Sequence, residues 1–367
     1  MKNYRDEIYS ENPEQDIWRE LLQFTYEANI IRWKKLDGCS EDDEIVQCIS
    51  GSFLQANEYY KAATDANLQI APLLLYYGTT NLLYGMSCLI SGSKAVVENH
   101  GMKLKLPEKM EFIADAGVHF LSPKDGGVHV AARAMGFEED LTVFGDWALK
   151  EFFDSLAEIR RDYNRCYGVL CGKTLMLDVF HTPDGDVQKI YYTAEDRQET
   201  ERLIYMVDNF EKNYLPVTCG QDNETEREYF ILRKKLNGKD ITEISYSGQP
   251  YLRAAHEKNG KCITLPTLLN MYIALFILAS LCRYHPAVWN PFVRKDTTGE
   301  RLLIEKFLYY ARRMIPEIVL KQILNRDLQY VSRRYQPRDT IRHVGEHEIQ
   351  ELVKKEVRRQ SNHGAVH

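Results

Sequence analysis

Near the carboxyl end of the sequence, Arg338 and His343 stand at a spacing that suits acid–base chemistry on a phosphodiester. The histidine can move a proton to or from a ribose 2′-hydroxyl or a leaving oxygen. The arginine can stabilise the charged phosphorane that forms between reactant and product. The pair therefore indicates RNA cleavage, at a site completed across a homodimer. The competing interpretation is a solvated basic tail, in which arginine and histidine fall at this distance by chance.

A second group of residues suits the binding of an anionic small molecule. Its members lie in two apolar segments or follow them: Tyr77, Asn81, His100, Arg283 and Trp289. The guanidinium of Arg283 can bind a phosphate or a carboxylate through two parallel hydrogen bonds, and Trp289 can stack on a base. The structural alternatives are that Asn81 fixes a neighbouring tyrosine, that His100 is satisfied in a turn, and that Arg283 complements a helix dipole.

These side chains converge if the two apolar segments are helices that pack side by side. Asn81 lies on the first helix and His100 follows it, whereas Arg283 and Trp289 follow the second. An antiparallel arrangement would leave Arg283 near the start of the first helix, away from His100. We expect a parallel arrangement, in which His100 and Arg283 meet at a shared end and hold an anionic ligand by charge-assisted hydrogen bonds.

The histidines raise the question of a metal site, whose ligands would be His100, His119, His129 and His181. Residues 118–121 and 128–131 flank a turn-forming segment and predict a β-hairpin. In that hairpin, His119 and His129 would lie on opposite faces of the sheet. We therefore expect neither a metal nor a cofactor. The sequence also lacks GxxxxGK[ST], GxSxG and HExxH, which removes the easiest enzyme classes and leaves open whether the chain is an enzyme.

The elements that must position these residues include two long runs without formal charge. One lies between Asp65 and Lys94, and the other spans Cys262 to Cys282. Each is long enough to cross a bilayer. However, polar residues 78–81 interrupt the first run, and neither run is flanked by a basic cluster that would orient a span. The pattern favours two helices buried in a soluble core, with no membrane partner.

Helices and strands are distributed unevenly along the 367 residues, and the pattern predicts an α+β fold with a mainly helical core. Helices are expected from Asn12-Pro13 to about residue 37, over 52–67, over 147–167, and over 300–313 and 315–325. A second hairpin is expected over 175–192, and further strands over 229–232 and 241–246. The predicted parts are 1–100 (helical), 101–255 (a mixed strand and helix insertion), 256–345 (helical) and 346–367 (a charged tail).

Composition indicates the cellular compartment of the protein and the class of partner that it can bind. The net charge of −6 argues against nucleic-acid binding over the whole surface, although the C-terminal segment from residue 301 is locally basic and could steer an anionic partner. The eight cysteines show no CxxC spacing, and the polar N-terminus has no signal-peptide pattern. We therefore expect reduced thiols in a cytoplasmic protein.

Three stretches of the sequence resemble the YaaC-like family. They are Ala71-Pro72-Leu73-Leu74-Leu75-Tyr76-Tyr77-Gly78 with Asn81-Leu82-Leu83, then His100-Gly101-Met102, then Arg283-Tyr284-His285-Pro286-Ala287-Val288-Trp289. The resemblance implies a soluble, intracellular bacterial protein with a helical core and a small β insertion. It supplies no established catalytic residues.

A looser resemblance links the Tyr76-Tyr77-Gly78-x-x-Asn81 segment to HEPN-type proteins, many of which are ribonucleases or toxin components. Their usual signature, an arginine followed four to six residues later by a histidine, is matched by Arg338 and His343. Two functional hypotheses follow. The first is a non-catalytic binding or regulatory module with a polar-lined pocket between the two buried helices. The alternative is a HEPN-type ribonuclease or toxin-like effector in stress response or phage defence.

Overall fold

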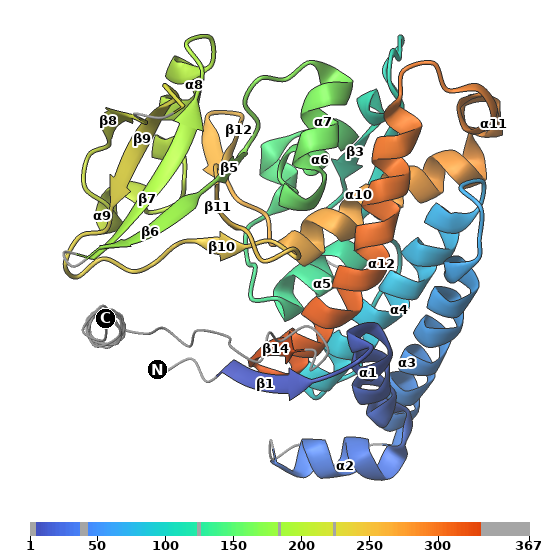
Figure 1. Ribbon diagram of the computed structural model, residues 1–367. Coiled ribbons are helices and arrows are strands. Elements are labelled where there is room, and N and C mark those ends of the chain that lie inside the picture. The colour runs from blue at the N-terminus through green and yellow to red at the C-terminus, as the bar shows by residue number, and fades with distance from the viewer. Residues whose placement is uncertain (1–4, 37–42, 123–125, 183–184, 223–224, 332–367) are drawn as a thin grey trace, which may run out of the picture. The chain divides into compact units, whose positions relative to one another are not determined.

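The computed structural model describes residues 5–36, 43–122, 126–182, 185–222 and 225–331, which belong to two compact units (Figure 1). The smaller unit contains β1 (Arg5–Tyr9) and β14 (Asp327–Val331), which pair in parallel. The larger unit, Glu14–Asn325, contains the remaining helices and strands. The predicted boundary between residues 345 and 346 lies outside the described residues.

The larger unit begins with helices, and the predicted helix start at Asn12-Pro13 is confirmed. The helices are α1 (Pro13–Leu22), α2 (Glu27–Leu36), α3 (Asp43–Thr64) and α4 (Ala71–Ser91). The expected single helix to residue 37 is wrong, because a 3₁₀ turn at Gln23–Thr25 separates α1 from α2. There the hydroxyl of Thr25 donates to the carbonyl oxygen of Leu22 at 2.7 Å, so a side chain competes with the backbone ladder.

Helices α3 and α4 approach each other closely at two glycines of α4. A Cβ atom at Gly78 would lie 2.7 Å from Cδ2 of Tyr60, and one at Gly85 would lie 3.0 Å from Cε2 of Phe53. The hydroxyl of Tyr60 shares a buried hydrogen bond of 2.9 Å with Thr79. Glycine at these two positions therefore lets aromatic rings of α3 lie against the backbone of α4.

The segment after α4 contains a three-stranded sheet and then short helices. Strand β3 (Gly117–Phe120) pairs antiparallel with β2 (Met102–Lys105) on one side and with β4 (Trp147–Ala148) on the other. The predicted hairpin over 118–131 is wrong, because residues Gly127–Ala134 form helix α5. Val128, Ala131 and Ala132 are buried at helical spacing, and β2 and β4 take the places beside β3.

The two histidines of that segment consequently have separate environments. The Nδ1 atom of His119 lies 2.6 Å from an Asp146 carboxylate oxygen at the surface. His129 is buried, with Nε2 2.9 Å from the carbonyl oxygen of Leu121. Among the described residues there is no group of three or more His, Cys, Asp or Glu side chains that could hold a metal ion.

The predicted helix over 147–167 is divided into α6 (Leu149–Asp154) and α7 (Arg160–Tyr167), with a 3₁₀ turn at Ala157–Ile159 between them. The strands that follow form small sheets. A three-stranded sheet in the order β10-β11-β5 and a two-stranded β12-β13 pair contain β5 (Thr174–Met176), β10 (Glu243–Ile244), β11 (Pro250–Arg253), β12 (His256–Lys258) and β13 (Lys261–Ile263).

A four-stranded antiparallel sheet contains the second predicted hairpin, which is confirmed. Its order is β6-β7-β9-β8, with β6 (Asp178–Thr182), β7 (Gly185–Tyr192), β9 (Glu228–Arg233) and β8 (Thr218–Gln221). Helices α8 (Arg197–Tyr205) and α9 (Phe210–Asn213) contribute to a hydrophobic core on one face of this sheet. That core includes Ile190 and Phe230 from the strands and Leu203 from α8.

The chain then returns to helix, with α10 (Thr267–Tyr284), α11 (Pro286–Lys295) and α12 (Glu300–Leu324). The two helices expected over 300–325 are one continuous helix, in which Pro316 is buried. Figure 1 shows α4, α10 and α12 together, and each of these helices contacts the other two. The N-terminal and C-terminal helices of the larger unit thus share one core.

Helices α4 and α10 pack against each other, as the two charge-free runs predict. The ring of Tyr76 stacks on that of Tyr272 with centroids 5.5 Å apart, and it meets the ring of Phe276 at 5.7 Å. Among the described helices, α10 is long and apolar enough to cross a membrane, but 78% of it is buried inside the protein. This burial is typical of the central helix of a soluble core.

The contacts along α4 and α10 show that the two helices run antiparallel. Just before α4, the carbonyl oxygen of Gln69 accepts a hydrogen bond from the thiol of Cys282, near the end of α10. Further along α4, Tyr76 stacks on Tyr272, which lies nearer the start of α10. The expected parallel arrangement is therefore wrong, because helix direction depends on the long connection between the helices and not on local sequence.

A substitution in α10 tests the assignment of this core. Leu275 is fully buried, so Leu275→Asp should abolish soluble expression, because an unpaired carboxylate in that position is strongly unfavourable. Leu302 on α12 is 70% exposed, and Leu302→Asp should leave both expression and melting temperature unchanged. A folded Leu275→Asp protein with a wild-type melting temperature would refute the core assignment.

Candidate functional site

The chain turns back after α4 and brings His100 to the first half of that helix. Gly92 ends α4 in the left-handed conformation, and the backbone N–H of Ala95 already lies 3.3 Å from the thiol of Cys88. This returning segment, residues 92–100, brings His100 to Tyr76, and the Tyr76 hydroxyl shares a hydrogen bond of 2.8 Å with Nδ1 of His100. His100 therefore lies near the start of α4 and not beyond its end.

Hydrogen bonds on both sides hold this part of the backbone in place. The side-chain oxygen of Asn99 accepts a hydrogen bond from the N–H of Gly101 at 2.7 Å. The backbone carbonyl oxygen of Asn99 accepts another from the N–H of Gly127 at 2.8 Å. The carbonyl oxygen of His100 accepts from Val128 at 3.1 Å. The start of α5 thus fixes the backbone that carries the His100 imidazole.

Arg283 arrives at the same place from the end of α10. Its guanidinium donates a hydrogen bond to the hydroxyl of Tyr77 and lies 5.9 Å from the centre of that ring. It also lies 4.9 Å from the ring of Tyr284. Arg283 is exposed, and it makes no ion pair with any residue that the structure describes. The antiparallel helices therefore bring Arg283 to Tyr77, whose ring lies 5.5 Å from that of Tyr76, the partner of His100, by a route that the sequence did not predict.

The electrostatics of the two side chains are coupled. Burial and, second, the positive charge of Arg283 lower the pKa of His100. The imidazole is therefore mainly neutral at pH 7, with Nδ1 engaged by Tyr76. Burial also raises the pKa of Tyr76, so its hydroxyl stays protonated. The arrangement offers one permanent cation and one neutral imidazole that protonates more readily when an anion is near.

Two tyrosines complete the site and were not predicted from the sequence. The ring of Tyr59 on α3 stacks on Tyr77 with centroids 6.0 Å apart, and Tyr284 is 62% exposed beside Arg283. Tyr284 could have been found as the neighbour of Arg283 in the sequence, whereas no local signal pairs Tyr59 with Tyr77. We call this group the cation–aromatic cluster: Tyr59, Tyr77, His100, Arg283 and Tyr284.

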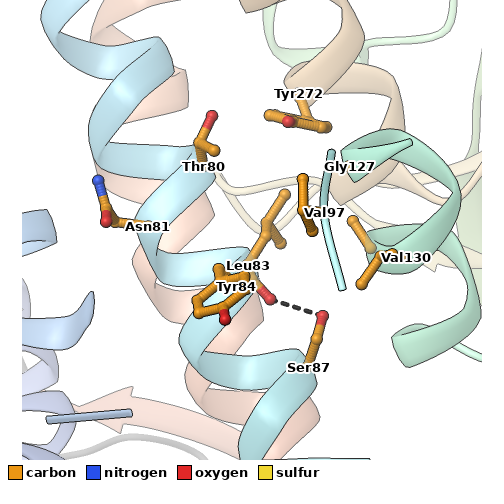
Figure 2. Close-up of a pocket in the computed structure, with 10 residues that line it drawn as sticks. Thr80, Asn81, Leu83, Tyr84, Ser87, Val97, Gly127, Val130 and Tyr272 are labelled. Atoms are coloured by element: carbon orange, nitrogen blue, oxygen red, sulfur yellow. Dashed lines mark hydrogen bonds between the residues drawn. The ribbon is translucent and has the colours of Figure 1, made fainter. Parts of the chain in front are cut away.

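A small cavity of about 120 Å³ lies beside α4 (Figure 2). Residues of α4, of the returning segment, of α5 and of α10 line it: Thr80, Asn81, Leu83, Tyr84, Ser87, Val97, Gly127, Val130, Ala131 and Tyr272. The hydroxyls of Thr80 and Ser87 donate to carbonyl oxygens of their own helix, at 2.9 and 2.7 Å. The cavity is therefore mainly apolar, and its size suits only a few non-hydrogen atoms.

Asn81 is the predicted ligand-binding residue that lines this cavity. Its side-chain amide donates to the carbonyl oxygen of Tyr77 at 2.9 Å, within α4. In Figure 2 the side chain leaves α4 on the side away from Tyr272 and Val130. Asn81 thus satisfies the helix backbone, as the Thr80 and Ser87 hydroxyls at the cavity also do.

Trp289 has a structural role in α11. The side chain is fully buried, and its Nε1 donates to the carbonyl oxygen of Gln69 at 3.3 Å. The thiol of Cys282 donates to the same oxygen, so Gln69 joins the end of α10 and the first turn of α11 to the start of α4. A buried indole cannot stack on a ligand, and Trp289 does not belong to the cation–aromatic cluster.

Two other groups capable of chemistry are enclosed in the protein. Ser155 and His256 are both buried, and the serine hydroxyl lies 2.5 Å from Nε2 of the histidine. The carboxylate of Glu300 is buried too, and accepts hydrogen bonds from the N–H groups of Ile113 and Ala114 and from the Tyr167 hydroxyl. These are structural contacts between distant segments. The predicted catalytic pair, Arg338 and His343, lies outside the described residues.

The Ser155–His256 contact has a consequence for stability in acid. Burial lowers the pKa of His256 from 6.5 to about 3, so the unfolded chain binds a proton that the folded chain excludes. The free energy of unfolding should therefore fall as the pH decreases from 6.5 toward 3. His256→Gln should flatten this dependence in urea unfolding measured over a pH series. An equally steep fall in the variant would contradict the assignment.

The closeness of Arg283 and His100 is tested by titration. Arg283→Ala should raise the pKa of His100, because it removes a positive charge that disfavours the imidazolium. NMR of the imidazole ring protons measures this pKa, and His100→Gln assigns the signal. Arg294→Ala, which removes an exposed arginine of α11, should not change it. If the Arg283→Ala protein gave the wild-type value, the two side chains could not be neighbours.

Comparisons with known proteins give one family. The model of the YaaC-like protein family matches residues 15–323, which is most of the chain. No curated protein matches the sequence, and no solved structure matches the fold. The match includes the helices that carry the cation–aromatic cluster. By this match, the chain belongs to the YaaC-like family.

Proposed function

We propose that this YaaC-like protein is a non-catalytic binding or regulatory module that takes a small anionic ligand at the cation–aromatic cluster. One observation carries the proposal. The guanidinium of Arg283 is exposed and held by Tyr77, and no described carboxylate pairs with it. An arginine fixed in this way is available for a phosphate or a carboxylate, which its planar fork binds with two hydrogen bonds.

The neighbouring groups support the same ligand class. His100 presents a partly exposed imidazole whose Nδ1 is held by Tyr76, which leaves Nε2 as a second contact for the anion. The rings of Tyr59, Tyr77 and Tyr284 offer surface for a planar part of the ligand. Because α3, α4 and α10 fix these side chains before binding, little conformational entropy is lost when the ligand arrives.

The proposal is one of binding in the cytoplasm of a bacterial cell, as the family resemblance implies. The ribonuclease alternative depends for its catalytic residues on Arg338 and His343, which lie outside the described residues. The small cavity beside Tyr272 suits an apolar substituent of the ligand and not its charged group, because the Thr80 and Ser87 hydroxyls that line it are engaged within α4.

Binding of simple anions tests this proposal. Inorganic phosphate, citrate and a nucleoside monophosphate should be compared by thermal shift and by isothermal titration calorimetry. Arg283→Ala should weaken the binding of a responding anion roughly tenfold or more, because a hydrogen bond to a charged group is worth about 1.5–3 kcal/mol. Arg283→Lys should restore it only in part, and Arg294→Ala should bind as the wild type does.

The pH dependence of binding has a definite sign. The pKa of His100 is lowered in the free protein, and a bound anion raises it by favouring the imidazolium. Affinity should therefore increase as the pH falls, and His100→Gln should remove that increase. Equal binding by the wild-type and Arg283→Ala proteins would refute the assignment, as would no response to any of the three anions.

A further inference from the structure

The four-stranded sheet has one face that its own hydrophobic core does not use. Alternate residues of β7 and β9 point into the core with α8 and α9: Ile190, Tyr192, Phe230 and Leu232. The residues between them necessarily point to the opposite face, because side chains alternate along a strand. On that outer face lie Lys189 and Tyr191 of β7 and Tyr229 of β9.

Aromatic rings gather on the two central strands of the outer face. Tyr191 and Tyr229 stand directly opposite each other, with ring centroids 5.5 Å apart. Phe180 on β6 stands on the same face and is 43% exposed, and the two tyrosines are half-buried. The three rings extend across three neighbouring strands of a twisted sheet.

A glycine on the edge strand allows one of these rings to lie against the sheet. Gly220 of β8 stands opposite Tyr229, and a Cβ atom there would lie only 2.5 Å from Cε2 of the tyrosine. The ring of Tyr229 therefore lies over the backbone of β8, a position that a larger residue than glycine would block.

Positively charged side chains lie against these aromatic rings. The Nζ atom of Lys189 lies 4.0 Å from the centre of the Tyr229 ring and 4.4 Å from that of Phe180. The guanidinium of Arg227 lies 4.3 Å from the centre of the Tyr191 ring. Neither cation makes an ion pair with the part of the chain that the structure describes. The acid on this face is Asp178, which stands opposite Lys189 in the register.

We propose that this outer face binds single-stranded nucleic acid. Unpaired bases stack on aromatic rings without regard to sequence, and Lys or Arg side chains beside the rings pair with the phosphates. The outer face supplies both, with the rings on adjacent central strands and a cation next to each ring. A duplex keeps its bases stacked inside and could use only the charges.

In the free protein, the two cations shield the aromatic rings of this face from water. Lys189 and Arg227 cover ring faces while no ligand is present, through cation–π contacts. When a base stacks on a ring, the cation transfers to a phosphate of the same strand. The site is separate from the cation–aromatic cluster, and its proposal does not rest on that function.

Fluorescence anisotropy with a short labelled oligouridylate measures this binding in the full chain. The double variant Tyr191→Leu with Tyr229→Leu should bind roughly tenfold or more weakly, because stacking on each ring is lost. Tyr191→Phe with Tyr229→Phe keeps both rings and should bind as the wild type does. Tyr26→Leu, which removes a tyrosine that is 62% exposed elsewhere, is the matched control. Circular dichroism checks that every variant is folded.

Salt dependence separates the charges from the rings. Lys189→Gln should lower the slope of log affinity against log salt by about 0.7, the value for one phosphate contact on a single strand. Arg294→Ala, which removes an exposed arginine that belongs to neither proposed site, should leave oligouridylate binding and its salt slope unchanged. The proposal is overturned if the wild type does not bind the oligomer at low salt, or if duplex RNA binds equally well. It is also overturned if the folded double leucine variant binds as tightly as the wild type, or if the folded double phenylalanine variant binds more weakly.

Discussion

Aromatic rings fill the contact between α4 and α10, and the direction in which the two helices pass each other decides where the polar groups of the region lie. Tyr76 stacks on Tyr272 in an antiparallel pair of helices. The start of α4 therefore meets the end of α10, and later turns of α4 meet earlier turns of α10. Arg283 consequently reaches Tyr77, and Cys282 reaches Gln69. A parallel packing of the same apolar surfaces would bury similar area but would disperse the cation–aromatic cluster.

The architecture was predictable wherever the signal was local. The two charge-free runs have no polar face, so burial on all sides was the physical conclusion, and α10 bears it out. The turn residues Pro183-Asp184-Gly185 between two strand-forming runs predicted the β6–β7 hairpin. At residues 127–134, however, a short apolar pattern fitted strand and helix alike, and the pairing of β3 with β2 and β4 decided between them.

The candidate site was harder to predict, because its members meet through tertiary structure. Sequence order suggested that His100 would stay at the end of α4, yet the returning segment places it beside Tyr76. Trp289 looked like a stacking surface, and its indole is instead a buried hydrogen-bond donor to Gln69. Tyr59 carries no signal at all, since stacking on Tyr77 depends on how closely α3 and α4 approach at their glycines.

The larger unit contains a second hydrophobic core, formed by the four-stranded sheet with α8 and α9. Its strand and helix residues fall within 175–254, so they contact one another without the central helices α4 and α10. Two cores that share few side chains need not open together. In native-state hydrogen exchange, the amides of β7 and β9 would then behave as one cooperative block, with a free energy of opening below that of α10. The sheet could loosen or tighten around a ligand while the helical core stays intact.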